Sequence, residues 1–134
     1  MKTGVITQQC AKIHLRTLMK IEDFVFGSIR IDDTVYTEDL LIDDGRVLPR
    51  EKDASRKFRD SFGHTPLSAE EKIPWNCKRL LIGTGVDEKL PVMDEVYAEA
   101  KRRGVDLLVL PTAEAIRQYL KEPENTNVIL HITC

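Results

Sequence analysis

Residues 79–110 read RLLIGTGVDEKLPVMDEVYAEAKRRGVDLLVL, and this stretch decides the fold. Its first apolar run, at residues 80–82, is short, continuous and bounded by Gly83, as in a strand that is buried on both faces. Apolar side chains then recur at helical spacing, at Met93, Val96, Tyr97 and Ala100. Gly104 ends this predicted helix, and residues 105–110 form a second buried strand. A strand, a helix and a strand in this order predict a right-handed parallel crossover.

The sequence after the crossover predicts one more helix and one more strand. Thr112 is placed to cap the helix, which Pro123 ends. The apolar positions expected to face inward are Ala113, Ile116, Tyr119 and Leu120. Residues 128–132 form the last predicted strand.

The sequence before the crossover has the alternation and the turn dipeptides of antiparallel strands. Residues 24–31 alternate and are followed by Asp32-Asp33, after which a second run begins at Val35. Residues 39–43 and 46–48 flank the turn dipeptide Asp44-Gly45. This antiparallel meander and the parallel crossover together predict an α/β fold with a mixed central sheet that is covered by helices.

Two features are predicted for the segment that joins the meander to the crossover. Residues 50–62 are almost wholly charged or polar, so we expect an exposed loop. Ser68 and Glu71 have capping-box spacing, which predicts a short helical turn before Pro74.

Length and composition limit the class of protein. A chain of 134 residues, 42% of them hydrophobic, supports a single core, which we place at residues 21–134 behind an amino-terminal extension at residues 1–20. A net charge of −2 offers no general attraction to nucleic acid. No apolar run is long enough to cross a membrane. Three scattered cysteines, Cys10, Cys77 and Cys134, are typical of free thiols in a reducing compartment, so we expect a cytoplasmic protein.

The loop Gly83-Thr84-Gly85 directly follows a predicted parallel strand, where exposed backbone N–H groups can bind phosphate or carboxylate. Thr112 follows the next strand and would share the same edge of the sheet. A candidate cleft for a small anionic ligand therefore contains these residues, with His64 as a possible acid or base. Two alternatives stay open, since the glycines could serve only the turn and Thr112 could be only a helix cap. There is no third glycine at dinucleotide-binding spacing, and we expect no cofactor and no bound metal.

A basic cluster lies between residues 46 and 59. We interpret Arg46, Arg50, Arg56 and Arg59 as a candidate surface for a protein partner, and a solvated charged surface is the alternative. His131 and Cys134 could hold a metal or carry catalysis, but residues three apart on a strand point to opposite faces. They could converge only if the strand ended or bent between them. A structural histidine and a terminal thiol are therefore the favoured interpretation.

Several short motifs, in order along the chain, resemble those of the Mth938-like family. They are Phe26-Gly27, Ile31-Asp32, residues 81–85, residues 111–115 and the closing Leu130-His131-Ile132-Thr133-Cys134, and Gly63-His64 resembles a loop histidine of the family. The resemblance spans residues 21–134 and implies a three-layer α/β fold with a mixed central sheet. Many members have no known function. The eukaryotic relatives include a mitochondrial complex I assembly factor and an adipogenesis-associated protein, which implies association with partners.

Two functional hypotheses follow. The first is a non-catalytic interaction or assembly-type protein, because the sequence contains no nucleophile elbow, P-loop or other catalytic motif. The second is a protein or enzyme that binds a small anionic metabolite at the Gly83-Thr84-Gly85 loop.

Overall fold

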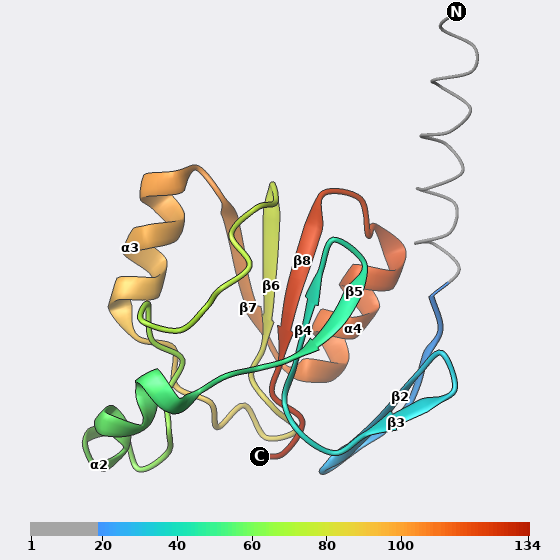
Figure 1. Ribbon diagram of the computed structural model, residues 1–134, viewed down its shortest axis with the longest axis horizontal. Helices are drawn as coiled ribbons and strands as arrows, with labels where there is room; N and C mark the ends of the chain where they lie inside the picture. The colour runs from blue at the N-terminus through green and yellow to red at the C-terminus, as the bar shows by residue number, and fades with distance from the viewer. Residues whose placement is uncertain (1–18) are drawn as a thin grey trace, which may run out of the picture.

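The computed structural model describes residues 19–134, so all but the last two residues of the predicted extension lie outside the described part (Figure 1). The strands are β1 Ile21–Val25, β2 Ser28–Ile31, β3 Thr34–Tyr36, β4 Leu40–Asp43, β5 Arg46–Pro49, β6 Arg79–Gly83, β7 Asp106–Leu110 and β8 Thr126–Leu130. The helices are the 3₁₀ helix η1 Asp53–Phe58 and the α-helices α2 Arg59–Phe62, α3 Asp94–Arg103 and α4 Thr112–Lys121.

The strands form two sheets. One is antiparallel with the order β1-β2-β3, and the other is mixed with the order β5-β4-β8-β6-β7. In the mixed sheet β6 pairs in parallel with β7 and β8, whereas β4 pairs antiparallel with β5 and β8. The predicted α/β fold with a mixed central sheet is therefore confirmed, and so is the parallel strand-helix-strand crossover.

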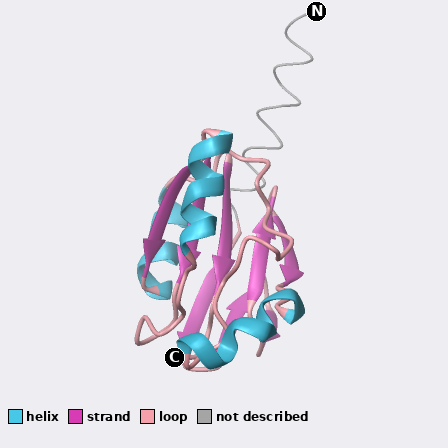
Figure 2. Ribbon diagram, turned by 90° about the vertical axis from the view of Figure 1, so that its left-hand side faces the viewer, coloured by secondary structure: helices cyan, strands magenta, loops and turns pink. Residues whose placement is uncertain are grey.

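The mixed sheet is the middle of three layers because its strands bury both faces (Figure 2). Alternate residues of a strand point to opposite faces, so Leu81 packs into one core and Leu80 and Ile82 into the other. One face is covered by α4 and the antiparallel sheet. The other is covered by α3, through Val96 and Ala100, and by the segment around Leu67 and Ile73.

The predicted meander is divided between the two sheets. The single strand expected at residues 24–31 is interrupted by a turn at Phe26-Gly27, where Gly27 has a φ of 83°. This turn makes β1 and β2 a hairpin, and the predicted turn at Asp32-Asp33 then joins β2 to β3. The second hairpin, β4 and β5 around Asp44-Gly45, belongs to the mixed sheet as its edge.

The segment predicted as an exposed loop at residues 50–62 is mostly exposed, but it is not a loop, because most of it is helical in η1 and α2. Its polar residues include two that are buried, Arg50 and Ser55. The Ser55 hydroxyl lies 2.7 Å from that of Ser68 and donates to the Glu71 carboxylate, which fixes the segment on the body of the protein. The Glu71 carboxylate binds Ser55 and does not complete a capping box with Ser68. The helical turn predicted at Ser68 is therefore only a hydrogen-bonded turn, which the Glu71 amide closes by donating to the Ser68 carbonyl.

Three further expectations are corrected by packing. Strand β7 was expected to be buried but lies at the edge of the mixed sheet and is half-buried or exposed along its length. Ala113 and Leu120 are exposed on α4, and Ala115 takes the inward position beside Ile116 and Tyr119. Tyr97 is also exposed, so α3 packs through its smaller residues. Within residues 19–134, no helix combines the length and apolar character needed to span a bilayer.

Candidate functional site

The candidate site lies at the carboxyl end of the central strands β6 and β8. Beyond β8, residues 131–134 run alongside the loop that follows β6. The His131 amide donates to the Gly83 carbonyl at 2.9 Å, and the Val86 amide donates to the Thr133 carbonyl at 2.8 Å. The amides of Asp87 and Lys89 both donate to the Cys134 carbonyl. The last residues of the chain are therefore held in place by the glycine-containing loop.

Glycine is required at Gly83 and Gly85 because the chain passes too close for a side chain. A Cβ at Gly85 would lie 2.3 Å from the backbone carbon of Cys134, and one at Gly83 would lie 2.8 Å from Thr112 Oγ1. Gly85 also has a φ of 110°, which other residues rarely adopt. The Thr84 amide donates to the Leu110 carbonyl at 2.8 Å. The amide groups of the loop thus bind other parts of the chain, which supports the alternative that its glycines serve only the turn.

Contrary to the prediction, Thr112 does not cap α4, although it is the first residue of that helix. The N-cap residue is Pro111, and no side chain caps the helix. Thr112 Oγ1 instead accepts a hydrogen bond from the Gly85 amide at 2.7 Å and donates one to the His131 carbonyl at 2.6 Å. This buried hydroxyl joins the ends of three elements. A ligand-binding role for Gly83, Thr84, Gly85 and Thr112 stays a prediction, and their observed role is to position residues 131–134.

A cavity of about 200 Å³ opens between residues 131–134 and the helical segment η1–α2, and we call it the carboxyl-end cavity. Both segments lie at the same end of the molecule in two perpendicular views (Figures 1 and 2). The residues that line it are Lys52, Arg56, Arg59, His64, Thr65, Leu90, His131, Thr133 and Cys134. Of the predicted site residues, it therefore unites His64 with Arg56 and Arg59.

The lining of the carboxyl-end cavity is cationic. Lys52, Arg56 and Arg59 contribute three positive charges, and none of the cavity-lining residues in the described range 19–134 is acidic. Arg56 pairs with the exposed Asp53, whereas among residues 19–134 no side-chain hydrogen bond or ion pair engages Lys52 or Arg59. A concave site with unpaired cations attracts anions. The structure thus concentrates positive charge in one place on a chain whose net charge is −2.

Strand register explains why a second set of charged residues lies behind this cavity. Leu40 of β4 pairs with Leu130 of β8 and with Pro49 of β5. Asp39, one position before β4, therefore lies opposite His131 on one side and Arg50 on the other. Asp39 Oδ2 is 2.8 Å from His131 Nδ1 and accepts a hydrogen bond from Arg50 Nη1 at 2.9 Å.

Arg50 is the centre of a buried network. Its prediction as part of an exposed partner surface is therefore wrong. Its guanidinium binds both carboxylate oxygens of Glu71, at 2.9 and 2.8 Å, and also donates to the Pro66 carbonyl. Its side chain is only 1% exposed. Burial by itself lowers the pKa of Arg50, but the carboxylates of Glu71 and Asp39 outweigh it and raise that pKa above its usual value.

Asp39 is also charged in the folded protein. Burial by itself raises the pKa of Asp39. The hydrogen bond and the electrostatic interaction with His131, the charge of Arg50 and the Ile132 amide outweigh this effect, so the pKa lies below its usual value. A charged Asp39 that accepts from both neighbours fixes the orientation of the His131 ring at the cavity.

The interpretation of His131 as a structural residue and of Cys134 as a terminal thiol assumed that the last strand continued through them. Strand β8 ends at Leu130, so the condition for their convergence is met, and both line the carboxyl-end cavity. His131 is positioned by Asp39 and points its other ring nitrogen towards Thr133. Sequence reasoning missed Lys52 and Thr133 altogether, and the only signal for Thr133 was its place in the closing motif. No cluster suited to a metal ion is formed by the His, Cys, Asp and Glu residues between 19 and 134.

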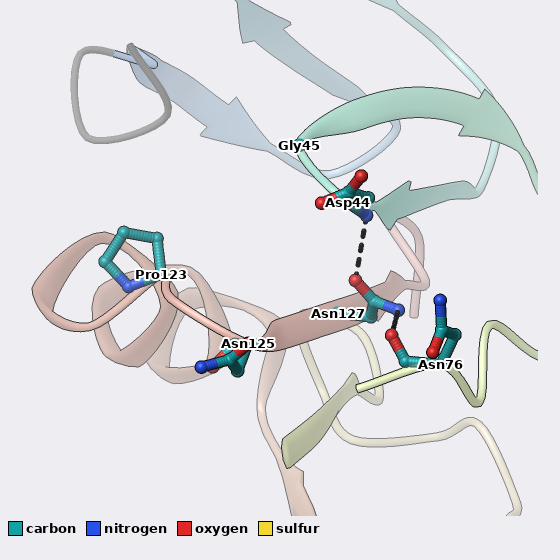
Figure 3. Close-up of a pocket in the computed structure, with 7 residues that line it drawn as sticks. Asp44, Gly45, Asn76, Pro123, Asn125 and Asn127 are labelled. Carbon is teal, nitrogen blue, oxygen red and sulfur yellow. Dashed lines mark hydrogen bonds between the residues drawn. The ribbon is translucent and has the colours of Figure 1, made fainter. Parts of the chain in front are cut away.

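A second hollow, of about 210 Å³, lies at the opposite end of the mixed sheet, and we call it the amino-end cavity (Figure 3). It is lined by Asp44, Gly45, Asn76, Pro123, Asn125, Thr126 and Asn127. Asn127 Oδ1 accepts a hydrogen bond from the Asp44 amide at 2.9 Å, and its Nδ2 donates to the Pro74 carbonyl at 2.9 Å. Arg46 follows this turn on β5 and so lies far from Arg56 and Arg59.

Comparisons with known proteins give a family and a set of similar folds. A family model described as protein of unknown function (DUF498/DUF598) matches residues 21–130. The conserved hypothetical protein PH1505 from Pyrococcus horikoshii OT3 is 28% identical with a TM-score of 0.75, over 87% of this chain and 100% of that one. The protein MT938 is 28% identical with a TM-score of 0.66, over 87% of this chain and 99% of that one. A Mth938-like domain protein from Bordetella pertussis shares the fold at 19% identity and a TM-score of 0.58, over 87% of each chain.

Proposed function

The chain belongs to the DUF498/DUF598 family of proteins of unknown function, and on that premise we propose that it binds a small anionic metabolite in the carboxyl-end cavity. The observation that carries this proposal is the convergence of Lys52, Arg56 and Arg59 on one cavity whose lining, within the described part of the chain, contains no acidic side chain. The positive charges of this lining repel one another in an empty site, and a bound anion stabilises the site because it neutralises them.

The chemistry of the cations favours phosphate or carboxylate groups. Arginine presents a planar fork of donors that binds two oxygens of either group at once, and lysine adds a point charge. Arg59 and Lys52 have no competing side-chain partner among residues 19–134, so their donors are available. His64 at the exposed rim supplies one more donor or acceptor.

The size of the cavity limits the ligand. A volume of about 200 Å³ is below the range of about 300 to 1,000 Å³ that is common for drug-sized ligands. It suits a phosphorylated or carboxylated compound of a few heavy atoms. This function is the second hypothesis drawn from the sequence, moved from the glycine loop to the cavity beside it.

Arg59→Gln tests the proposal, because it removes the cation and keeps an unbranched polar side chain. Thermal-shift screening of the wild type against inorganic phosphate and panels of small phosphorylated and carboxylated compounds identifies ligands, since a ligand at 100 times its Kd stabilises by about 2.7 kcal/mol. Calorimetric titration should then show Arg59→Gln binding about 10- to 100-fold more weakly, the loss expected for a charged hydrogen bond.

Arg46→Gln is the matched control, because Arg46 is an exposed arginine at the other end of the sheet. It should bind the same ligand with wild-type affinity. The proposal fails if no compound in a broad panel shifts the unfolding temperature. It also fails if both arginine variants lose the same affinity, since that would indicate a general charge effect.

Association with a protein partner, the first hypothesis drawn from the sequence, stays a prediction. The four arginines named for it do not form one surface, because Arg50 is buried and Arg46 lies at the opposite end of the sheet from Arg56 and Arg59. We therefore assign no residues to a partner surface.

A further inference from the structure

A carboxylate, an imidazole and a hydroxyl lie in a row beside the carboxyl-end cavity. Asp39 Oδ2 is 2.8 Å from His131 Nδ1, and His131 Nε2 is 3.3 Å from Thr133 Oγ1. With the Nδ1 proton directed at the carboxylate, Nε2 presents its lone pair to the hydroxyl. Hydrolases on unrelated folds use this order of groups to turn a hydroxyl into a nucleophile.

The first two groups are held rigidly. Asp39 Oδ1 accepts a hydrogen bond from the Ile132 amide at 3.1 Å, while Oδ2 lies within hydrogen-bond distance of both Arg50 and His131. The Asp39 side chain is 5% exposed and that of His131 is 13% exposed. Only the Nε2 side of the imidazole, towards Thr133, remains for chemistry.

The surroundings of Thr133 suit a reaction that develops negative charge. Thr133 and His131 line the same cavity as Lys52 and Arg59. Cations that line the same cavity as a hydroxyl nucleophile stabilise the oxyanion that forms when the hydroxyl attacks a carbonyl group. They also bind a substrate that carries its own negative charge.

We propose that Thr133 is the nucleophile of a hydrolytic site for small anionic carboxylic esters, with His131 as general base and Asp39 as the positioning residue. Recognition of the substrate's anionic group rests on the proposed function, whereas activation of the Thr133 hydroxyl rests on the contacts of Asp39 and His131.

Each step balances without a further reagent. Thr133 Oγ attacks the ester carbonyl carbon while His131 Nε2 takes the hydroxyl proton. The bond from that carbon to the alcohol oxygen breaks, and His131 returns the proton to the departing alcohol. A water molecule then attacks the acyl-threonine, giving one proton to His131, which passes it to Thr133 Oγ as the acid departs. The net reaction is ester plus water to carboxylic acid plus alcohol.

The experiment measures release of 4-nitrophenol from mono-4-nitrophenyl succinate by the full chain, with the succinyl group as the small anionic part that the cavity would bind and 4-nitrophenol as the leaving group. Thr133→Val and His131→Gln should each lower kcat by about 100-fold or more, the range of a general-base contribution. Thr133→Ser keeps a hydroxyl and should retain turnover. Thr37→Val, at an exposed threonine outside the cavity, is the matched control and should keep the wild-type rate.

Acid quenching during turnover, followed by peptide mass spectrometry, identifies the acylated residue. We expect the succinyl group on Thr133 in the wild type. Acylation of Cys134, which lines the same cavity, without acylation of Thr133 would overturn the proposal. Asp39→Asn should lower kcat and leave KM near the wild-type value, because the amide no longer orients the imidazole but the cations that bind the substrate remain.

Measuring the binding of inorganic phosphate distinguishes a failure of the hydrolytic proposal from a failure of the proposed anion-binding function. Phosphate binding without any turnover that depends on Thr133 overturns the hydrolytic proposal alone. Hydrolysis of neutral 4-nitrophenyl acetate that depends on Thr133, with no binding or inhibition by phosphate, supports the nucleophile and overturns the anion site. Circular dichroism and wild-type phosphate affinity of Thr133→Val show that the variant is folded.

Discussion

The two ends of the mixed sheet carry hollows of nearly equal size, about 200 Å³ at the carboxyl end and about 210 Å³ at the amino end, with different chemistry. At the amino end, Asn127 engages its amide with the Asp44 turn and the Asn76 carbonyl (Figure 3). At the carboxyl end, Lys52 and Arg59 face the cavity with no side-chain partner among residues 19–134. Volume alone does not mark a functional site. The unpaired cations are what single out the carboxyl-end cavity as the candidate site.

The two ends also differ in what supports them. Behind the carboxyl-end cavity, Glu71, Arg50, Asp39 and His131 form a continuous chain of buried contacts. The amino end is held by turns, by the Asn127 amide and by Arg79, whose guanidinium contacts Thr126 and Glu122 but is more exposed than that of Arg50. Breaking the carboxyl end should therefore cost more stability than equivalent changes at the amino end.

Arg50→Ala should have the largest effect. It leaves the carboxylates of Asp39 and Glu71 buried without their common partner, a change that typically costs about 3 to 5 kcal/mol of unfolding free energy. Urea denaturation measures the loss. Arg46→Ala, an exposed arginine at the amino end, should stay within about 0.5 kcal/mol of the wild type. Equal losses in the two variants would contradict the distinction between the two ends.

Gly85→Ala should have the next largest effect. Its Cβ would lie 2.3 Å from the Cys134 backbone at a φ of 110°, so strain and overpacking add to about 2 to 4 kcal/mol. Gly104 ends α3 at the amino end of the sheet with a φ of 70° and open space around it, so Gly104→Ala should cost about 1 kcal/mol. Thermal unfolding compares the two. An equal cost would mean that the contact with residues 131–134 does not constrain the loop.

Acid should produce the smallest effect. Because the pKa of Asp39 is lowered in the folded protein, the unfolded chain takes up this proton first as the pH falls. The stability contributed by Asp39 is complete above its ordinary pKa of 3.8 and is lost as the pH falls below that value. The difference in unfolding free energy between the wild type and Asp39→Asn should therefore shrink below about pH 4 in urea titrations. A difference that stays constant with pH would place the stabilisation elsewhere.

Local pattern was enough to predict most of the fold. The crossover at residues 79–110, the turn at Asp44-Gly45 and the end of α3 at Gly104 follow from apolar spacing and turn chemistry. Prediction failed where a polar residue has a distant partner. The local sequence of Arg50 and Ser55 is typical of an exposed loop, but both side chains are buried against Glu71. Thr112 has the position of a helix cap, but its hydroxyl accepts a hydrogen bond from the Gly85 amide. The sequence around a polar residue does not identify the distant residue that it contacts in the folded protein.

By itself, the sequence determined the family and the α/β class, because apolar periodicity and short motifs are local properties of the chain. It named His64, Arg56 and Arg59 as candidates, but it did not place them in one cavity. The tertiary structure decided which polar groups converge. Pairing of Leu40 with both Leu130 and Pro49 places Asp39 between His131 and Arg50, and the end of β8 at Leu130 turns Thr133 towards the same cavity. Strand register brings together residues that lie 92 positions apart, and such convergence depends on the whole sheet.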